Sequence, residues 1–385
     1  MRHKIVMVML SVALIVGLAL TGCIEPAVEE EAPEEIVIGV FEPMTGPYAA
    51  GGQMTKEGID MAVEENPEVL GRPVKMVLVD NRSEKVEAAN AVARLIDYEG
   101  AVVVVGTYGS ACAIPGSEVA NNAQIPYIGC SPTNPLVTVG KPYAFRVCFI
   151  DPYQGGAAAK FAIEQLGAEN TVIIQDIASD YSVGLSKFYR EAFIEVKGPD
   201  AILEVSNFAT GDQDFTAQLT SAKTKNPDVI FIPCAAYGEA ALMIRQGREM
   251  GIEVPFLGGD TWEAPEFLEV AGEAAEGTYY TTHFDPAAKT TAKAVAFCTA
   301  FEEKYGRPPS AFAALGYDAY CRAIDAIEEA GSTDGEAIRE ALAASKDWEA
   351  VTGMITFDEN GDPLKAVIVR TIKNGEVQYV TSIRP

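Results

Sequence analysis

Short apolar segments alternate with amphipathic segments from residue 36 onward, and this alternation predicts repeated strand–helix units. Segment 102–105 is apolar throughout, as is typical of a strand that is buried on both faces of a parallel sheet. The first run of units consists of strands at 36–41, 75–79, 102–105 and 125–128 and helices at 57–65, 84–98 and 115–123.

The alternation begins again after Pro152. Repeated β-α-β units favour doubly wound parallel sheets, so two successive runs predict an α/β protein with two such lobes. The second run consists of helices at 155–166, 184–196, 214–224 and 239–250 and strands at 171–175, 201–205, 229–232 and 256–257.

Longer helical segments follow His283, and they favour a lobe that the chain leaves and later rejoins over a separate third domain. The predicted elements are helices at 291–305, 311–330 and 335–345, then strands at 354–357 and 366–372 with a turn at 358–362 between them.

The first 35 residues predict where the protein works. A basic start is followed by the apolar segment 5–20, which suits a secretory leader but is short for a membrane-spanning helix. The leader ends in Leu20-Thr21-Gly22-Cys23, which resembles the lipobox of prokaryotic lipoproteins and implies cleavage after residue 22 and lipidation of Cys23. The alternative is an ordinary signal peptide with an incidental cysteine.

Residues 24–35 contain six glutamates and two prolines, a composition that keeps a segment extended, so residues 23–35 are interpreted as an acidic tether. The protein is therefore expected to be anchored through Cys23 to the outer face of the cytoplasmic membrane.

Length and charge narrow the function further. The 385 residues exceed what one hydrophobic core usually serves, which agrees with two lobes. The formal net charge of −26 gives the chain no electrostatic attraction to a phosphate backbone, so nucleic-acid binding is excluded.

The cysteines predict neither a metal site nor a particular disulfide pattern. No pair is spaced as CxxC and His283 is the only histidine after the leader, so neither a structural zinc site nor a cofactor is expected. Disulfide bonds remain open, because their connectivity cannot be read from sequence. The cysteines after Cys23 are Cys112, Cys130, Cys148, Cys234, Cys298 and Cys321.

Ligands of parallel α/β proteins bind beyond the carboxyl ends of the strands, so the residues that follow each predicted strand are the candidates for a site. Ser110 follows the strand at 102–105, and Ser131 and Thr133 follow the strand at 125–128. Hydroxyl groups beside free backbone amides suit a carboxylate. The alternative is that these residues only cap helices.

A different set of polar residues follows the strands of the second run. Tyr181 and Tyr237 follow two of them, and Asp260 follows the last after two glycines. A carboxylate in that position suits an ammonium group, although it is equally suited to capping the next helix.

These segments, in this order, resemble the branched-chain amino-acid-binding proteins of ABC importers, a type I periplasmic-binding-protein family. The similarity extends from residue 36 to the C-terminus, and each motif is short. The motifs are Met44-Thr45-Gly46-Pro47, Gly106 to Ser110, Ser131 to Pro135, Asp151-Pro152-Tyr153-Gln154-Gly155, Asp180-Tyr181, Arg245-Gln246, Gly258-Gly259-Asp260, Tyr317-Asp318-Ala319 and Phe357 to Asp362.

The resemblance implies two doubly wound parallel-sheet lobes joined by a three-stranded hinge. It assigns 36–151 plus 284–361 to the first lobe and 152–283 plus 362–385 to the second, with crossings near Asp151, His283 and Asp362.

The resemblance also implies roles for the candidate residues. Ser110 and Thr133, with the backbone at Ser131, would bind the α-carboxylate of an amino acid, and Asp260 would pair with its α-ammonium group. Tyr181 would close over the ligand from the second lobe. Tyr237 and Tyr108 would line the pocket.

The chain departs from the family at several positions near the expected pocket. Gly51 stands where some relatives have an aromatic wall residue, and Tyr108 stands where a smaller apolar residue is common. Ser83 and Gly109 replace a cysteine pair that forms a disulfide in some members. The side-chain pocket is therefore expected to be rebuilt, and the ligand's identity is the least determined part of the prediction.

The expected function is that of a monomeric solute-binding lipoprotein that binds a hydrophobic or branched-chain amino acid, such as leucine, by hinge closure and delivers it to an ABC permease with cytoplasmic ATPases. The alternatives are a protein of the same fold for an aromatic acid, amide or urea, and a sensory module for a membrane receptor. An enzyme is not expected, because GxSxG, Walker, GxGxxG and HExxH motifs are missing from the sequence.

Overall fold

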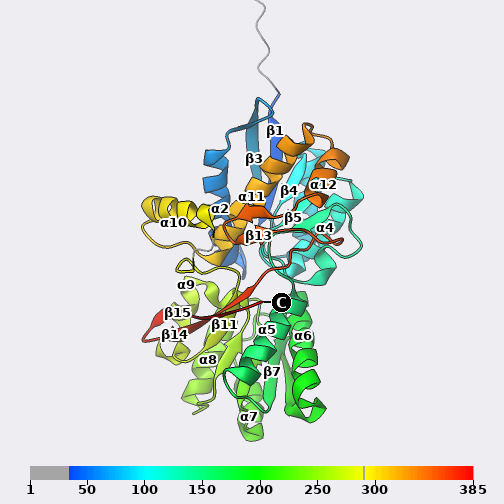
Figure 1. Ribbon diagram of the computed structural model, residues 1–385. Helices are drawn as coiled ribbons and strands as arrows, with labels where there is room; N and C mark the ends of the chain where they lie inside the picture. Colours follow the sequence, from blue (N-terminus) through cyan, green and yellow to red (C-terminus); the bar gives the residue numbers. More distant parts are fainter. Residues whose placement is uncertain (1–33, 289–290, 385) are drawn as a thin grey trace, which may run out of the picture. The chain divides into compact units, whose positions relative to one another are not determined.

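The computed structural model describes residues 34–288 and 291–384, and from Glu35 onward these form one compact unit (Figure 1). Within this described part, no helix combines the length and the apolar character that crossing a membrane requires.

The first sheet has six strands in the order β2-β3-β1-β4-β5-β6, and all neighbours are parallel except β2 and β3. Successive residues of β4 point to opposite faces: Val103 and Val105 join one apolar cluster, and Val104 joins another. The strands are β1 (Ile36–Glu42), β2 (Glu68–Val69), β3 (Arg72–Asp80), β4 (Val103–Val105), β5 (Tyr127–Gly129) and β6 (Ala144–Arg146).

Helices cover both faces of this sheet. One face packs against α2 (Ala49–Glu65) and α11 (Ala311–Ala330), and the other packs against α3 (Lys85–Asp97) and α4 (Ser110–Asn122). The short 3-10 helix η1 (Pro135–Val137) follows β5, and α10 (Ala292–Tyr305), α12 (Gly335–Ala343) and the hairpin of β12 (Trp348–Ala350) and β13 (Gly353–Ile355) belong to the same part.

The second sheet has seven strands in the order β15-β14-β11-β10-β9-β7-β8. The five strands from β11 to β8 are parallel, whereas β14 and β15 add an antiparallel edge. The strands are β7 (Thr171–Asp176), β8 (Ile202–Phe208), β9 (Val229–Ile232), β10 (Phe256–Gly258), β11 (Tyr279–Thr282), β14 (Val367–Lys373) and β15 (Glu376–Ile383).

The helical segments of the second part are α5 (Asp151–Glu164), α6 (Asp180–Lys197), η2 (Pro199–Ala201), α7 (Thr216–Lys225), α8 (Tyr237–Glu249), η3 (Asp260–Glu263), α9 (Pro265–Ala271) and η4 (Gly272–Ala275). The chain changes from one sheet to the other between β6 and α5, between β11 and α10, and between β13 and β14. We call the two parts the first and second lobes. Their predicted residue limits stay predictions.

The sequence places most strands and helices correctly but begins four helices too late. α2 begins at Ala49 instead of 57, α4 at Ser110 instead of 115, α5 at Asp151 instead of 155, and α6 at Asp180 instead of 184. These first turns consist mainly of small and polar residues, many of them buried, so they do not show the apolar spacing of an amphipathic helix.

The predicted turn at 358–362 is present, but the strands on its two sides lie in different sheets. β13 pairs with β12, which the sequence analysis missed, and β14 pairs with β11 and β15, which it also missed. The turn therefore connects the lobes.

The structure does not support disulfide bonds among the buried cysteines of the folded part. Cys112, Cys130, Cys148, Cys234 and Cys321 are buried and form no disulfide bond. Among the described residues there is also no group of three or more acidic, histidine or cysteine side chains that is arranged to hold a metal ion.

Candidate functional site

The predicted site residues lie in the loops and first helical turns that follow the strands of both sheets. In the first lobe, Ser110 begins α4, and Ser131 and Thr133 lie between β5 and η1. In the second lobe, Tyr181 lies in the first turn of α6 and Asp260 begins η3. All five side chains are buried.

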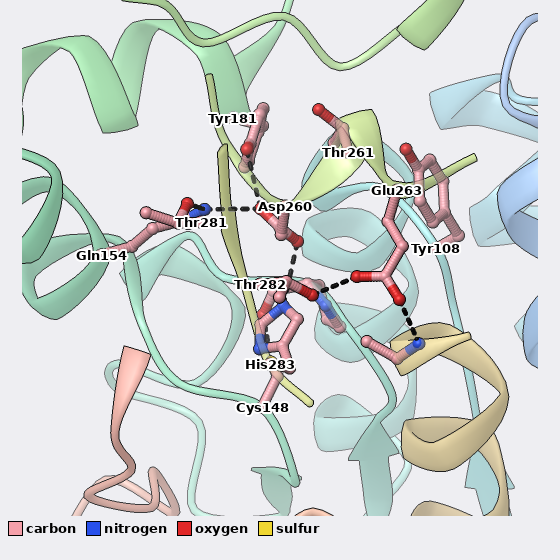
Figure 2. A network of polar contacts seen from close by, with 12 residues as sticks. Tyr108, Cys148, Gln154, Tyr181, Asp260, Thr261, Glu263, Thr281, Thr282 and His283 are labelled. Atoms are coloured by element: carbon pink, nitrogen blue, oxygen red, sulfur yellow. Dashed lines mark hydrogen bonds and ion pairs between the residues drawn. The ribbon is translucent and has the colours of Figure 1, made fainter. Parts of the chain in front are cut away.

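Asp260 is the centre of a hydrogen-bond cluster, as Figure 2 shows. Its Oδ1 atom accepts hydrogen bonds from the Gln154 amide at 2.7 Å and from the Tyr181 hydroxyl at 2.7 Å. Its Oδ2 atom lies 2.9 Å from Nε2 of His283. The structure thus brings together two predicted residues, Tyr181 and Asp260, and adds two residues to which the sequence analysis assigns no binding role.

This cluster keeps the Asp260 carboxyl group ionised. Burial acts to raise the pKa of Asp260, whereas its contact with His283 and then the hydrogen bonds from Gln154 and Tyr181 act to lower it, and the pKa is held below its usual value. A buried carboxylate with this support is a ready partner for a cation.

His283 is the neutral member of the cluster. Burial lowers its pKa, and the nearby Asp260 carboxylate only partly offsets that effect. The ring stacks on Phe149 with 3.7 Å between the centroids, and the neutral tautomer that donates from Nε2 fits the contact with Asp260. His283 therefore orients Asp260 without cancelling its charge.

Several polar atoms at this site are buried and have no protein partner. They are Oγ of Ser131, Oγ1 of Thr133, both carboxyl oxygens of Asp151 and Oε1 of Gln154. Burial raises the pKa of Asp151 to about 7, an effect that the nearby Thr133 hydroxyl reduces and the charge of Asp260 increases. Because an unsatisfied buried polar group costs free energy, such a collection indicates a polar ligand or bound water.

The helix-capping alternative does not describe these residues. The cap of α4 is Gly109, and the Ser110 hydroxyl instead accepts a hydrogen bond from the amide of Asn134 at 3.2 Å. The side chain that caps η1 is that of Asn134, which accepts from the amide of Leu136 at 3.0 Å.

Asp260 is likewise not the cap of η3, because the cap residue of that helix is Gly259. The Asp260 carboxylate is directed to the cluster of Figure 2.

Tyr108 lies between the lobes. Its ring is 2% exposed, and its hydroxyl donates to the carbonyl oxygen of Ala235, in the loop after β9, at 3.2 Å. Its backbone amide donates to Glu42 at 2.8 Å, which holds the loop after β4 against the end of β1. Tyr237, the first residue of α8, is only half-buried.

The residues that sequence reasoning missed are Asp151, Gln154 and His283. The sequence analysis treats Gln154 only as part of a family motif, Asp151 as part of that motif and as a hinge crossing, and His283 only as a hinge crossing. Gln154 is 106 positions from Asp260, so no local spacing could have joined them. Cys23, the predicted lipidation site, lies outside the described residues.

The comparisons with known proteins agree with this architecture. Residues 35–376 match the periplasmic binding protein family. The Leu/Ile/Val-binding protein BraC3 of Rhizobium johnstonii is 31% identical over 338 residues, which are 86% of this chain and 89% of the relative.

Two solved structures are similar over nearly their whole length. The leucine-binding protein LivK of Thermotoga maritima has a TM-score of 0.88 and 46% identity, covering 91% of this chain and 99% of that protein. The branched-chain amino acid transporter substrate-binding protein LivJ of Streptococcus pneumoniae, solved with isoleucine, has a TM-score of 0.85 and 34% identity, covering 91% and 100%.

The chain belongs to the periplasmic binding protein family, which confirms the predicted resemblance and the type I fold. Proteins of this family act outside the cytoplasm and bind solutes without transforming them, so the chain is not an enzyme.

Proposed function

We propose that this protein is the solute-binding lipoprotein of an ABC importer and that it binds an apolar or branched-chain amino acid between its two lobes. Its relatives are named as binding proteins for leucine, for leucine, isoleucine and valine, or for branched-chain amino acids, and these names support this substrate class.

The observation that carries the proposal is the presence of two sets of buried polar groups, one that suits an anion and one that suits a cation. The hydroxyls of Ser131 and Thr133 are buried and unpartnered on the first lobe, whereas the second lobe contributes an ionised, buried carboxylate at Asp260. A zwitterion carries one group for each, and both of its charges must be compensated when it is buried.

The ligand's α-carboxylate is placed at Ser110 and Thr133, with the backbone at Ser131. The N-terminus of α4, which begins at Ser110, favours a negative charge. The α-ammonium group is placed at Asp260. Tyr181, which bonds Asp260 at 2.7 Å, covers the ligand from the second lobe, and Tyr237 and Tyr108 lie along its side chain.

Hinge closure assembles the site, because its residues come from both lobes. The Asn134 amide donates to the carbonyl of Asp180 at 2.9 Å, and Lys85 lies 2.6 Å from the Asp180 carboxylate. These bonds connect the loop after β5 and the helix α3 to the start of α6, so they support a state in which the lobes meet over the ligand.

The remaining parts of the proposal concern location and partners. We infer lipid anchoring at Cys23, delivery to a permease with cytoplasmic ATPases, and a monomer in solution. A sensory module would differ only in its partner, so co-purification with a permease supports the importer and co-purification with a receptor supports the sensor.

Isothermal titration of the chain from Glu35 onward tests the ligand class. The protein is partly unfolded and refolded to remove carried-over ligand, then titrated with leucine, isoleucine, valine, phenylalanine, alanine, glutamate, benzoate and urea. Micromolar or tighter one-to-one binding of an apolar amino acid is expected. Binding of benzoate or urea alone, by protein shown to be folded, would contradict the amino-acid assignment.

A further inference from the structure

The apolar core of the second lobe extends into the first lobe through one group of side chains. The cluster built on β7, β9 and β10 also contains four first-lobe residues, Tyr48, Met54, Tyr108 and Phe312. Tyr108 is the member of this group whose polar atom also crosses between the lobes, because its hydroxyl donates to the carbonyl oxygen of Ala235 at 3.2 Å.

The Tyr108 ring is held on three sides. It packs edge-on against Phe312 of α11, with 5.0 Å between the ring centroids, and tilted against Tyr48 at 6.1 Å. On the third side the ring lies directly over Gly51 of α2, where an added Cβ would stand 2.3 Å from Cδ2 of Tyr108. A glycine at 51 is therefore required for the ring to occupy this position.

We propose that Tyr108 is a closure latch that also sets side-chain selectivity. The inference rests on the proposed function, since it takes the ligand to bind between the lobes. A ligand side chain placed between the lobes meets the Tyr108 ring. The Tyr108–Ala235 hydrogen bond forms only when the lobes meet, so it stabilises the closed complex after the ligand has entered.

Two substitutions separate the two roles. Tyr108→Phe removes the hydroxyl and keeps the ring, whereas Tyr108→Leu removes the hydroxyl and replaces the ring by a smaller aliphatic side chain. Tyr189→Phe is the matched control, because the Tyr189 hydroxyl is also buried and donates at 3.2 Å, but to Thr171 within the second lobe.

Leucine and phenylalanine binding is measured by titration, and dissociation rates are measured by stopped flow. Tyr108→Phe should weaken leucine binding about 3- to 10-fold, mostly through faster dissociation, and leave the leucine-to-phenylalanine ratio unchanged. Tyr108→Leu should also shift that ratio at least 5-fold toward phenylalanine, because the shortened side chain leaves room for a larger ligand. Tyr189→Phe should change neither quantity.

Each outcome bears on a different statement. Equal leucine affinity and dissociation rate in wild type and Tyr108→Phe overturn the latch, and an unchanged ratio in Tyr108→Leu overturns the selectivity role. A wild type that is folded and binds no amino acid overturns the proposed function, and the inference falls with it.

Discussion

Nε2 of His283 lies 2.9 Å from Oδ2 of Asp260, and the structure buries both side chains completely or nearly so (Figure 2). The pKa of each group is held below its usual value: that of His283 by burial, and that of Asp260 by its contact with His283 and by the hydrogen bonds from Gln154 and Tyr181. The pair is therefore a neutral imidazole donating to a carboxylate. Such a pair preserves a negative charge for the ligand, and burial opposes the protonation of the imidazole in acid.

The first prediction is that His283 makes the protein less stable in mild acid. A folded-state pKa below the unfolded value of about 6.5 means that the unfolded chain takes up the proton first. The free energy of unfolding should therefore fall as the pH decreases from about 6.5 to the folded pKa, and His283→Gln should remove this contribution.

Urea unfolding of the ligand-free protein at pH 5, 6, 7 and 8 measures the effect. Asp151, with a pKa raised to about 7, acts in the opposite direction over the same range, so the informative quantity is the difference between wild type and His283→Gln. Parallel profiles for the two proteins would contradict the neutral-imidazole interpretation.

The second prediction concerns the charge that binds the ligand's ammonium group. Asp260→Ala should weaken amino-acid binding by about 2 kcal/mol or more, roughly 30-fold in Kd, because a buried ammonium group would lose its charged partner. Asp214→Ala is the control, since Asp214 is exposed and bonds the amide of Thr216 in the second lobe. Wild-type affinity in folded Asp260→Ala, measured by titration, would show that the ammonium assignment is wrong.

The third prediction separates binding from stability at Thr133. Its hydroxyl is fully buried and makes no well-aligned hydrogen bond within the protein, although it lies near enough to the Asp151 carboxyl group to act on the pKa of that group. The near-isosteric Thr133→Val should therefore change thermal stability little. Ligand binding should fall at least 5-fold if this hydroxyl meets the carboxylate. Ser117→Ala is the contrasting control, because the buried Ser117 hydroxyl bonds Ile114 and Lys141 and its loss should cost stability without affecting binding. A stability loss without a binding loss in Thr133→Val would make Thr133 structural.

The sequence contained enough information for most of the strands, but not for β2, β6, β11, β12 and β15. Continuous apolar strands such as β4 and β9 are recognisable because both faces are buried. The first turn of α6 was missed because its residues do not follow an apolar repeat, and that of α4 was missed because Pro115, which lies inside the helix, is typical of the first turn of a helix.

The partners of Asp260 were beyond the reach of sequence reasoning for a different reason. Gln154 and His283 come from two separate chain crossings, and only the folded chain places both on one carboxylate. Likewise, the sequence marked Gly51 and Tyr108 as two unrelated departures, whereas the structure shows that one makes room for the other.

The fourth prediction is that ligand binding releases protons from Asp151. With its pKa raised to about 7 where the lobes meet, this buried carboxyl group is partly protonated at pH 7 in the closed protein before a ligand occupies it. An ammonium group bound at Asp260 favours the ionised form of Asp151, so about half a proton should leave on binding.

Titration in buffers of different ionisation enthalpy measures this release as the slope of the observed enthalpy. Asp151→Asn should abolish the slope. Glu42→Gln, which changes another buried carboxyl group whose pKa burial raises to about 8, should keep it. Equal slopes in wild type and Asp151→Asn would place the ammonium group away from Asp151.

The fifth prediction tests the contact between Gly51 and Tyr108 without any ligand. An alanine at 51 would put its Cβ 2.3 Å from a ring that Phe312 and Tyr48 prevent from moving freely. Gly51→Ala should therefore lower the free energy of unfolding by about 1–3 kcal/mol, even though alanine is the better helix former.

Gly156→Ala is the matched control, because Gly156 also lies in a helix, α5, and an added Cβ there meets nothing within 4 Å; it should be neutral or stabilising. Tyr108→Ala should recover most of the loss in the double variant, since it removes the Cγ, Cδ2 and Cε2 atoms that an added Cβ at residue 51 would meet. Urea unfolding of the four proteins of this double-mutant cycle gives the coupling energy directly. A coupling energy near zero would mean that the ring does not occupy the space over Gly51, and the basis for Tyr108 as a closure latch would be lost with it.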